Sequence, residues 1–126
     1  MTRRAGTLFA SFRFATAGLR YLLSSQRNAQ VQAAAGVAAL TLAALLRISR
    51  VEWAILTLTI ALVLVLAALN SAIEATVDLV TSEYHPLAKI AKDVAAGAVW
   101  LMALASVAIG AILFLPRLLA LLPVPR

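Results

Sequence analysis

The chain has 126 residues, of which 63% are hydrophobic and 13% are charged, and its mean hydropathy is +0.98. This composition lies outside the usual range for a soluble domain, and a chain of this length cannot bury so much apolar surface in its own core. Because cysteine is absent, disulfides, thiolate metal sites and thiol nucleophiles are excluded. The net charge of +6 does not indicate a nucleic-acid partner, since the basic residues form no tract and aromatic residues make up 6% of the chain. The composition therefore predicts an all-α integral membrane protein of one domain.

Residues 7–25 predict an amphipathic helix that lies in the membrane interface. Apolar residues recur there at helical spacing, namely Leu8, Phe12, Ala15, Leu19 and Leu22. The opposite side carries Arg13, Thr16, Arg20 and Ser24. Together with Arg3, Arg4 and Arg27, these arginines predict a cytoplasmic N-terminus, because basic residues accumulate on the cytoplasmic side of a first span.

Three apolar segments follow, and each is long enough to cross a hydrocarbon layer of ~30 Å. We expect spans over residues 29–46, 53–80 and 94–115, with residues 47–53 as a tight turn at the far headgroup layer. Pro116 and Arg117 predict the end of the third span, and residues 116–126 a short interfacial tail. Three crossings place the polar connection between the second and third spans on the same cytoplasmic side as the N-terminal helix.

The end of the second span carries Asn70, Glu74 and Asp78, which are four residues apart and therefore share one helix face. Facing lipid would cost these side chains several kcal/mol, so they must face protein, water or an ion. One interpretation is helix packing within an oligomer. The other is a functional site, and a proton or ion pathway is the weakest option because no second charged row lies within the membrane.

The following segment adds Glu83, His85, Lys89, Lys92 and Asp93. Carboxylates there could bind a hard divalent cation, and lysines could bind phosphate, a combination suited to phosphoryl transfer. The alternative for the two lysines is that they only reach headgroups. From its residue type alone, the single histidine is interpreted as structural. The sequence contains neither a Walker-type glycine loop nor a dinucleotide fingerprint.

Residues 68–78 (ALNSAIEATVD) and 82–99 (SEYHPLAKIAKDVAAGAV) closely resemble the central motif of the prokaryotic diacylglycerol kinase family, and most of all its undecaprenol kinase branch. The resemblance extends over residues 18–118. It implies a homotrimeric kinase of the bacterial inner membrane, with composite sites formed by neighbouring subunits. Such an enzyme transfers the γ-phosphate of ATP, with Mg²⁺, to a lipid hydroxyl at the cytoplasmic interface.

The resemblance also implies roles for individual residues. Glu74 matches the metal-binding glutamate, Asn70 an asparagine near the reacting groups and the lipid, and Asp78 an acidic position of the motif. The nucleotide site would comprise Glu74, Glu83, His85, Lys92 and Asp93.

Two positions depart from the family pattern. Ala67 stands where a glutamate is expected to act as the general base next to the lipid hydroxyl, and alanine cannot accept a proton. Gln26 stands where a second glutamate commonly shares the metal, so its amide would be a weaker, uncharged ligand. An introduced inactivating change is the preferred explanation of Ala67, and a natural non-catalytic relative is the alternative.

The sequence therefore predicts a lipid kinase of low activity, with undecaprenol as the preferred acceptor and diacylglycerol as the next. The alternative is a non-catalytic membrane protein that binds nucleotide or lipid and uses the polar row for oligomer packing.

Overall fold

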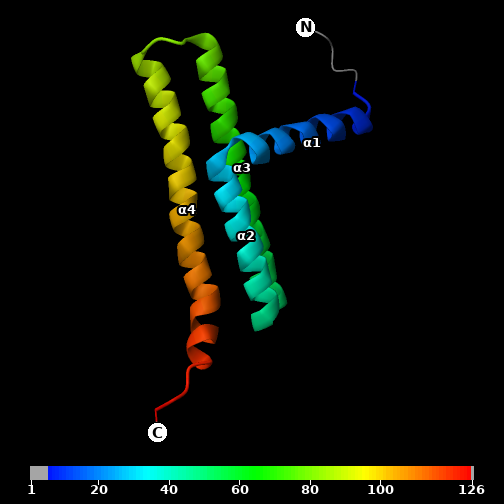
Figure 1. Ribbon diagram of the computed structural model, residues 1–126, viewed down its shortest axis with the longest axis vertical. Helices are drawn as coiled ribbons and strands as arrows, with labels where there is room; N and C mark the ends of the chain where they lie inside the picture. The colour runs from blue at the N-terminus through cyan, green and yellow to red at the C-terminus, as the bar shows by residue number, and fades with distance from the viewer. Residues whose placement is uncertain (1–5, 126) are drawn as a thin grey trace.

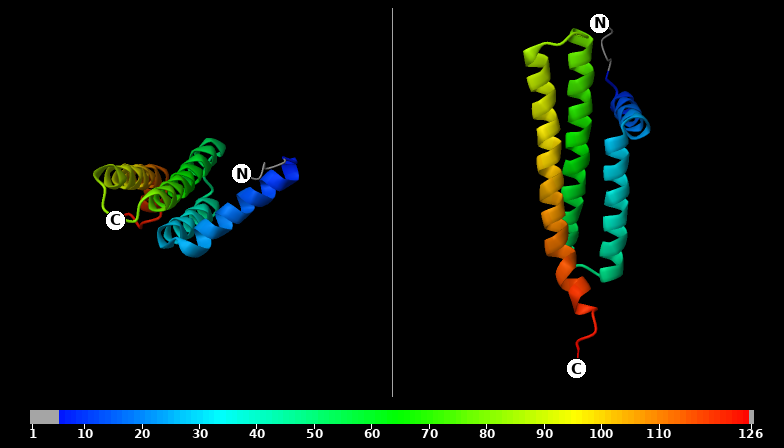
Figure 2. Two further views of the ribbon diagram at one scale, coloured as in Figure 1. Left: turned by 90° about the horizontal axis from the view of Figure 1, so that it is seen from above. Right: turned by 60° about the vertical axis from the view of Figure 1, so that its left-hand side comes forward.

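The computed structural model describes residues 6–125, which fold into four helices. α1 covers Leu8–Ser25, α2 Arg27–Leu46, α3 Arg50–Val80 and α4 Pro86–Ala120. The last three are long and apolar enough to cross a membrane. They run side by side, whereas α1 lies across them (Figures 1 and 2). The predicted all-α fold with three long apolar helices is confirmed, and the arginines at positions 3, 4 and 126 lie outside the described residues.

The helix boundaries follow from local capping. Thr7 caps α1 through its side chain, which accepts a hydrogen bond from the Ala10 N–H at 3.3 Å. Ser49 and Glu52 form a reciprocal capping box that starts α3. Arg47 ends α2 in the left-handed conformation, with φ 53°, which turns the chain from α2 into α3.

α4 differs most from the sequence prediction, because it extends beyond the expected span of 94–115 at both ends. Pro86 is at its first position, where a missing N–H costs nothing, so only residues 81–85 connect α3 to α4. The helix also continues past Pro116 to Ala120, although a tail was expected from residue 116. Arg117, one residue beyond the proline, donates a hydrogen bond to the Leu113 carbonyl at 3.2 Å and thereby supports this last turn.

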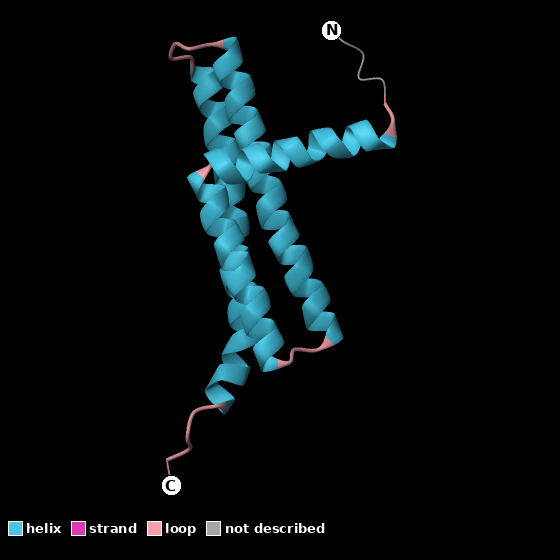
Figure 3. Cartoon of the chain, turned by 45° about the vertical axis from the view of Figure 1, so that its right-hand side comes forward, coloured by secondary structure: helices cyan, strands magenta, loops and turns pink. Residues whose placement is uncertain are grey.

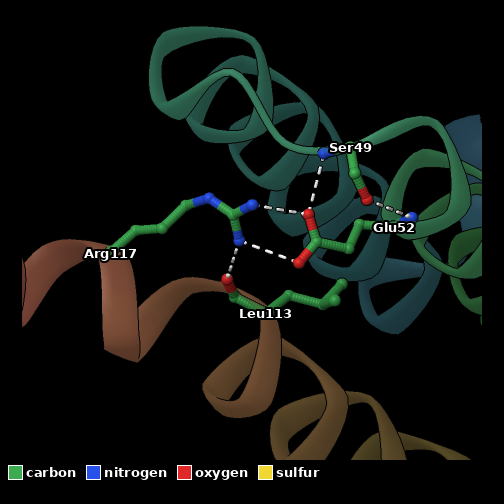
Figure 4. A network of polar contacts seen from close by, with 4 residues as sticks. All are labelled: Ser49, Glu52, Leu113 and Arg117. Atoms are coloured by element: carbon green, nitrogen blue, oxygen red, sulfur yellow. Dashed lines mark hydrogen bonds and ion pairs between the residues drawn. The ribbon is translucent and has the colours of Figure 1, made fainter.

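A network of polar contacts joins α4 to α3 (Figure 4). It lies near the start of α3 and the end of α4, at the end of the bundle opposite the 81–85 loop. The Arg117 guanidinium donates to both carboxylate oxygens of Glu52, at 2.8 and 2.7 Å. The same carboxylate accepts the Ser49 N–H at 2.8 Å. Apolar side chains pack nearby in the larger of two buried clusters, formed by Ala43, Ile48, Leu56, Leu113 and Phe114.

α3 and α4 are longer than a bilayer is thick. At ~1.5 Å per residue, the segment from Arg50 to Leu69 already covers ~30 Å, the full hydrocarbon core. α1 contacts α3 at the end of this segment, where Leu22 packs with Ala67. The rest of the hairpin, residues 70–93, extends beyond α1 (Figures 1 and 3). We call residues 70–93 the hairpin arm, and it contains most of the predicted site residues.

Candidate functional site

Ala67, the position of the expected base, faces the junction of α1 and α2. It is 4% exposed and packs with Leu22 and Ala29 in a small apolar cluster. Gln26 lies between these two in sequence, where it ends α1 and begins α2, and it is half-buried. The structure therefore places both departures from the family pattern in the same region of the bundle. The cluster itself offers no group that could accept a proton.

Asn70 and Glu74 begin the hairpin arm, one turn above Ala67. The Asn70 side-chain amide donates to the Glu74 carboxylate at 3.1 Å, and both residues are half-buried. The other polar atom of Asn70, Oδ1, is buried and has no hydrogen-bond donor among the described residues. An orphaned buried carbonyl oxygen is unfavourable, so this one is available to a ligand or a neighbouring subunit.

Ion pairs position both lysines of the arm. Lys92 of α4 contacts Asp78 of α3 at 2.5 Å and so bridges the two helices. Lys89 pairs with Asp93 one turn along α4. Glu74 and Glu83 take part in none of the ion pairs found within residues 6–125. Either of these two carboxylates could therefore bind a cation without first breaking an ion pair with a lysine.

The tip of the arm carries an open pocket of about 300 Å³. Its polar lining contains Asp78, Glu83, His85, Lys89, Lys92 and Asp93, together with Thr81, Ser82 and Tyr84. The Glu83 backbone is held by hydrogen bonds of its N–H and carbonyl with the Thr81 hydroxyl, both at 3.2 Å. His85 caps α4, because its Nδ1 accepts the Leu87 N–H at 3.2 Å, which leaves Nε2 as the nitrogen that carries the proton in the neutral ring.

The predicted site residues thus form two groups. Glu83, His85, Lys92 and Asp93 share the pocket, whereas Gln26, Ala67, Asn70 and Glu74 do not line it. Among the described residues, no three His, Asp or Glu side chains are close enough to share a metal ion. Sequence reasoning missed the pairing of Asp78 with Lys92, which joins positions 14 residues apart. It also missed the pairing of Lys89 with Asp93, although their four-residue spacing on a helix is a readable signal.

Fold and site together define a multi-pass membrane protein with a charged pocket at one end of its apolar helices. Comparison with known proteins identifies the kind of protein. The family model for prokaryotic diacylglycerol kinase matches residues 13–114. A diacylglycerol kinase of Synechocystis sp. is 49% identical over 119 residues, which cover 94% of this chain and 68% of the relative. An undecaprenol kinase of Bacillus subtilis is 47% identical over 110 residues, or 87% of this chain and 89% of the relative.

A diacylglycerol kinase of Escherichia coli is more distant, with 35% identity over 82 residues that cover 65% of this chain and 67% of the relative. The chain belongs to the prokaryotic diacylglycerol kinase family. Its class is therefore that of membrane lipid kinases, and the family resemblance of residues 68–99 is confirmed.

Proposed function

We propose that this chain is an ATP-dependent kinase that transfers the γ-phosphate to a lipid hydroxyl at the level of the headgroups. Undecaprenol is the preferred acceptor and diacylglycerol the next, and relatives bearing both names are similar over most of the chain. The observation that carries the proposal is the position of the hairpin arm. It holds carboxylates, lysines and a pocket where the apolar segments of α3 and α4 end, so a lipid head and a soluble nucleotide can meet there.

Electrostatics supports a nucleotide that binds together with a divalent cation. The arm contains four acidic residues against two lysines, a net charge of −2. It would repel a bare triphosphate, and its lysines are already paired. Mg²⁺ needs only one or two protein carboxylates in addition to the phosphates, so Glu74 fits it, with the Gln26 amide as an uncharged second ligand. Bound there, the metal would neutralise phosphate charge during transfer.

The other assigned residues act around this cation. Lys92 would move from Asp78 to a phosphate oxygen, and Asp93, Glu83 and His85 would line the nucleotide. The orphaned Asn70 oxygen would accept a hydrogen bond near the reacting groups. Because one chain does not bring these two groups of residues into one pocket, we propose that neighbouring subunits of a homotrimer complete the site.

Orientation and localisation belong to the same proposal. Among the described residues, the α1 side of the bundle carries Arg13, Arg20, Arg27, Lys89 and Lys92, whereas the opposite end carries Arg47, Arg50 and Arg117. The excess of basic residues favours a cytoplasmic position for α1 and for the 81–85 loop. The protein would then reside in the bacterial inner membrane, with ATP reaching the arm from the cytoplasm.

Ala67 makes slow turnover the expected behaviour, because loss of a positioned base reduces a rate by ~10²–10⁴-fold. We expect Ala67→Glu to raise the rate of phosphate transfer by a factor in this range. A carboxylate beside Leu22 and Ala29 is largely desolvated, which favours proton uptake. Transfer from radiolabelled ATP to undecaprenol and to diacylglycerol, measured in lipid nanodiscs, gives the rates.

The matched control is Ala67→Gln, which has almost the same volume and cannot act as a base. Equal rates for the glutamine and glutamate forms would contradict the base assignment at this position. Nucleotide binding without transfer in every form, with either acceptor, would instead identify the non-catalytic alternative. In that case Glu74→Gln should weaken the oligomer and leave Mg-ATP affinity unchanged.

A further inference from the structure

The turn between α2 and α3, residues 47–49, lies at the end of the bundle remote from α1 and the hairpin arm (Figure 3). Two exposed arginines flank it, Arg47 in the turn and Arg50 at the first position of α3, and we call them the basic pair. Neither takes part in an ion pair within residues 6–125. Because α3 covers ~30 Å between Arg50 and Leu69, the basic pair lies at the level of the headgroups on this side of the membrane.

The turn is anchored so that the basic pair stays outside the core. Ile48, which lies between the two arginines, is 6% exposed and belongs to the larger buried cluster. Its N–H donates to the Ala43 carbonyl at 3.3 Å, and the left-handed backbone of Arg47 closes the end of α2. On the other side, the Ser49 capping box fixes the start of α3. The fold therefore holds the backbone of the basic pair in place, which reduces the entropy lost when a ligand binds.

The acidic side chains of the protein are not available to the basic pair. The chain has five acidic residues, and four of them belong to the hairpin arm at the other end of the bundle. The fifth, Glu52, already accepts hydrogen bonds from both terminal nitrogens of Arg117 and from the Ser49 N–H. Copies of the chain inserted in one membrane share one orientation, so a neighbouring copy brings only its own Glu52 to this level. An anion for the basic pair therefore comes from the solvent or from the membrane.

The surface next to the basic pair favours a lipid as the source of that anion. Val51, Ile55 and Leu58 follow on α3 towards the hydrocarbon layer, and all three are exposed, so acyl chains can cover them. Guanidinium groups bind phosphate oxygens through paired hydrogen bonds, and basic residues at a membrane surface attract anionic lipids. We propose that the basic pair is a binding site for an anionic phospholipid, whose phosphate contacts Arg47 and Arg50 and whose acyl chains lie against α3.

This site is independent of phosphate transfer, because it lies at the end of the bundle opposite the candidate kinase site. Arg117 takes no part in it, since its guanidinium is bound to Glu52 (Figure 4). A zwitterionic lipid carries the same phosphate together with a cation, so its headgroup gains less from two arginines. The basic pair therefore distinguishes phospholipids by their net charge.

The two tryptophans of the chain can report separately on the two ends of the bundle. Trp53 lies about one turn from Arg50 and is half-buried, whereas Trp100 is 69% exposed and lies on α4 closer to the hairpin arm. In Trp100→Phe, Trp53 is the remaining tryptophan, and lipids brominated on their acyl chains quench it when they bind nearby. Vesicles of phosphatidylglycerol and phosphatidylcholine, with either lipid brominated, then give the relative affinity of the two lipids at Trp53.

In Trp100→Phe, the affinity for phosphatidylglycerol should be about 3- to 10-fold higher than that for phosphatidylcholine, since one arginine near the surface contributes a factor of about 5. This preference should decrease in about 1 M salt, which screens the attraction. Changing both Arg47 and Arg50 to glutamine should reduce the ratio to about 1. Changing both to lysine keeps the charge and should keep part of the preference.

The matched control combines Arg13→Gln with Arg20→Gln, which removes the same charge from α1 at the other end of the bundle. The preference at Trp53 should persist there. Equal quenching of Trp53 by the two brominated lipids, with the basic pair intact, would overturn the proposal. So would a preference that survives in the double glutamine form, because another part of the surface would then attract the lipid. Complete loss of the preference in the double lysine form would also overturn it, because the charge is retained.

Discussion

Glu52 and Arg117 show how two single residues connect helices that are far apart in sequence. Their contact spans 65 positions and is bidentate. In addition, Glu52 accepts a hydrogen bond from the Ser49 N–H, and Arg117 donates one to the Leu113 carbonyl (Figure 4). Planar, two-point pairing of arginine with a carboxylate is among the stronger polar contacts. The pair ties the last turns of α4 to the first turn of α3, and it accounts for the helical conformation beyond Pro116 that the proline alone does not predict.

A double-mutant cycle measures this contact. Arg117→Met should lower the thermal midpoint, because it leaves Glu52 without its partner. The same change in a Glu52→Gln background should lower it less, since glutamine keeps the capping box but lacks the charge. Thermal unfolding in one detergent gives all four midpoints. Strictly additive changes would show that the two side chains do not interact energetically.

At the scale of elements, the α3–α4 hairpin decides where the charges lie. α4 begins at Pro86, inside a stretch that the sequence marks only as polar, so Lys89, Lys92 and Asp93 project from a helix. Asp78 then holds Lys92 across the hairpin, and His85 caps the new helix start. The position of the predicted nucleotide residues is thus a property of the whole hairpin.

The two roles considered for His85, helix cap and nucleotide contact, can be separated by substitution. His85→Ala should destabilise the protein by about 1 kcal/mol, the usual effect of losing an N-cap, whereas His85→Asn should keep the cap. Chemical unfolding reports this difference. If the imidazole also contacts nucleotide, both variants should raise the KM for ATP. An unchanged KM in His85→Asn would restrict His85 to capping.

At the scale of the whole molecule, the candidate site residues of one chain do not meet in a single pocket. Ala67 faces its own α1–α2 junction, Glu74 lies one to two turns above it, and the loop pocket lies beyond Asp78 at the tip of the arm. Among the described residues, the buried side-chain oxygens of Gln32 and Asn70 also lack hydrogen-bond donors. A trimer with composite sites, which the family resemblance implies, would bring residues of neighbouring arms together.

Mixed oligomers test this arrangement. One form carries both substitutions, Ala67→Glu and Glu74→Gln, and would therefore have the base without the metal ligand. The unaltered chain would have the ligand without the base. Each form alone should transfer phosphate slowly. Co-expressed, they should exceed the activity of both if the two residues of one site come from different subunits. Mixing without any gain would place both groups in the same chain. Separately oligomerised forms, combined only after purification, serve as the control.

Sequence alone determined the class of architecture, and it predicted the central part of the candidate site. Apolar segments and an amphipathic helix are local patterns, because the cost of exposing a polar backbone or side chain to lipid applies to every segment separately. Asn70, Glu74 and Asp78 could be assigned to one face from their spacing, and the observed Asn70–Glu74 hydrogen bond agrees with that assignment. The motif of residues 68–99 was sufficient to predict the family, which the comparisons confirm.

Only the tertiary structure decided how far α3 and α4 extend beyond α1, and which charges meet. Asp78 contacts Lys92, and Glu52 contacts Arg117, because two long helices pack antiparallel. No local sequence pattern predicts which of these residues meet. The buried state of Ala67 and of the Gln32 oxygen likewise depends on neighbouring helices. In a bilayer, the length of its apolar segment determines whether a helix can cross the membrane. The partner of each polar group is instead determined by side-by-side contacts between segments that are distant in sequence.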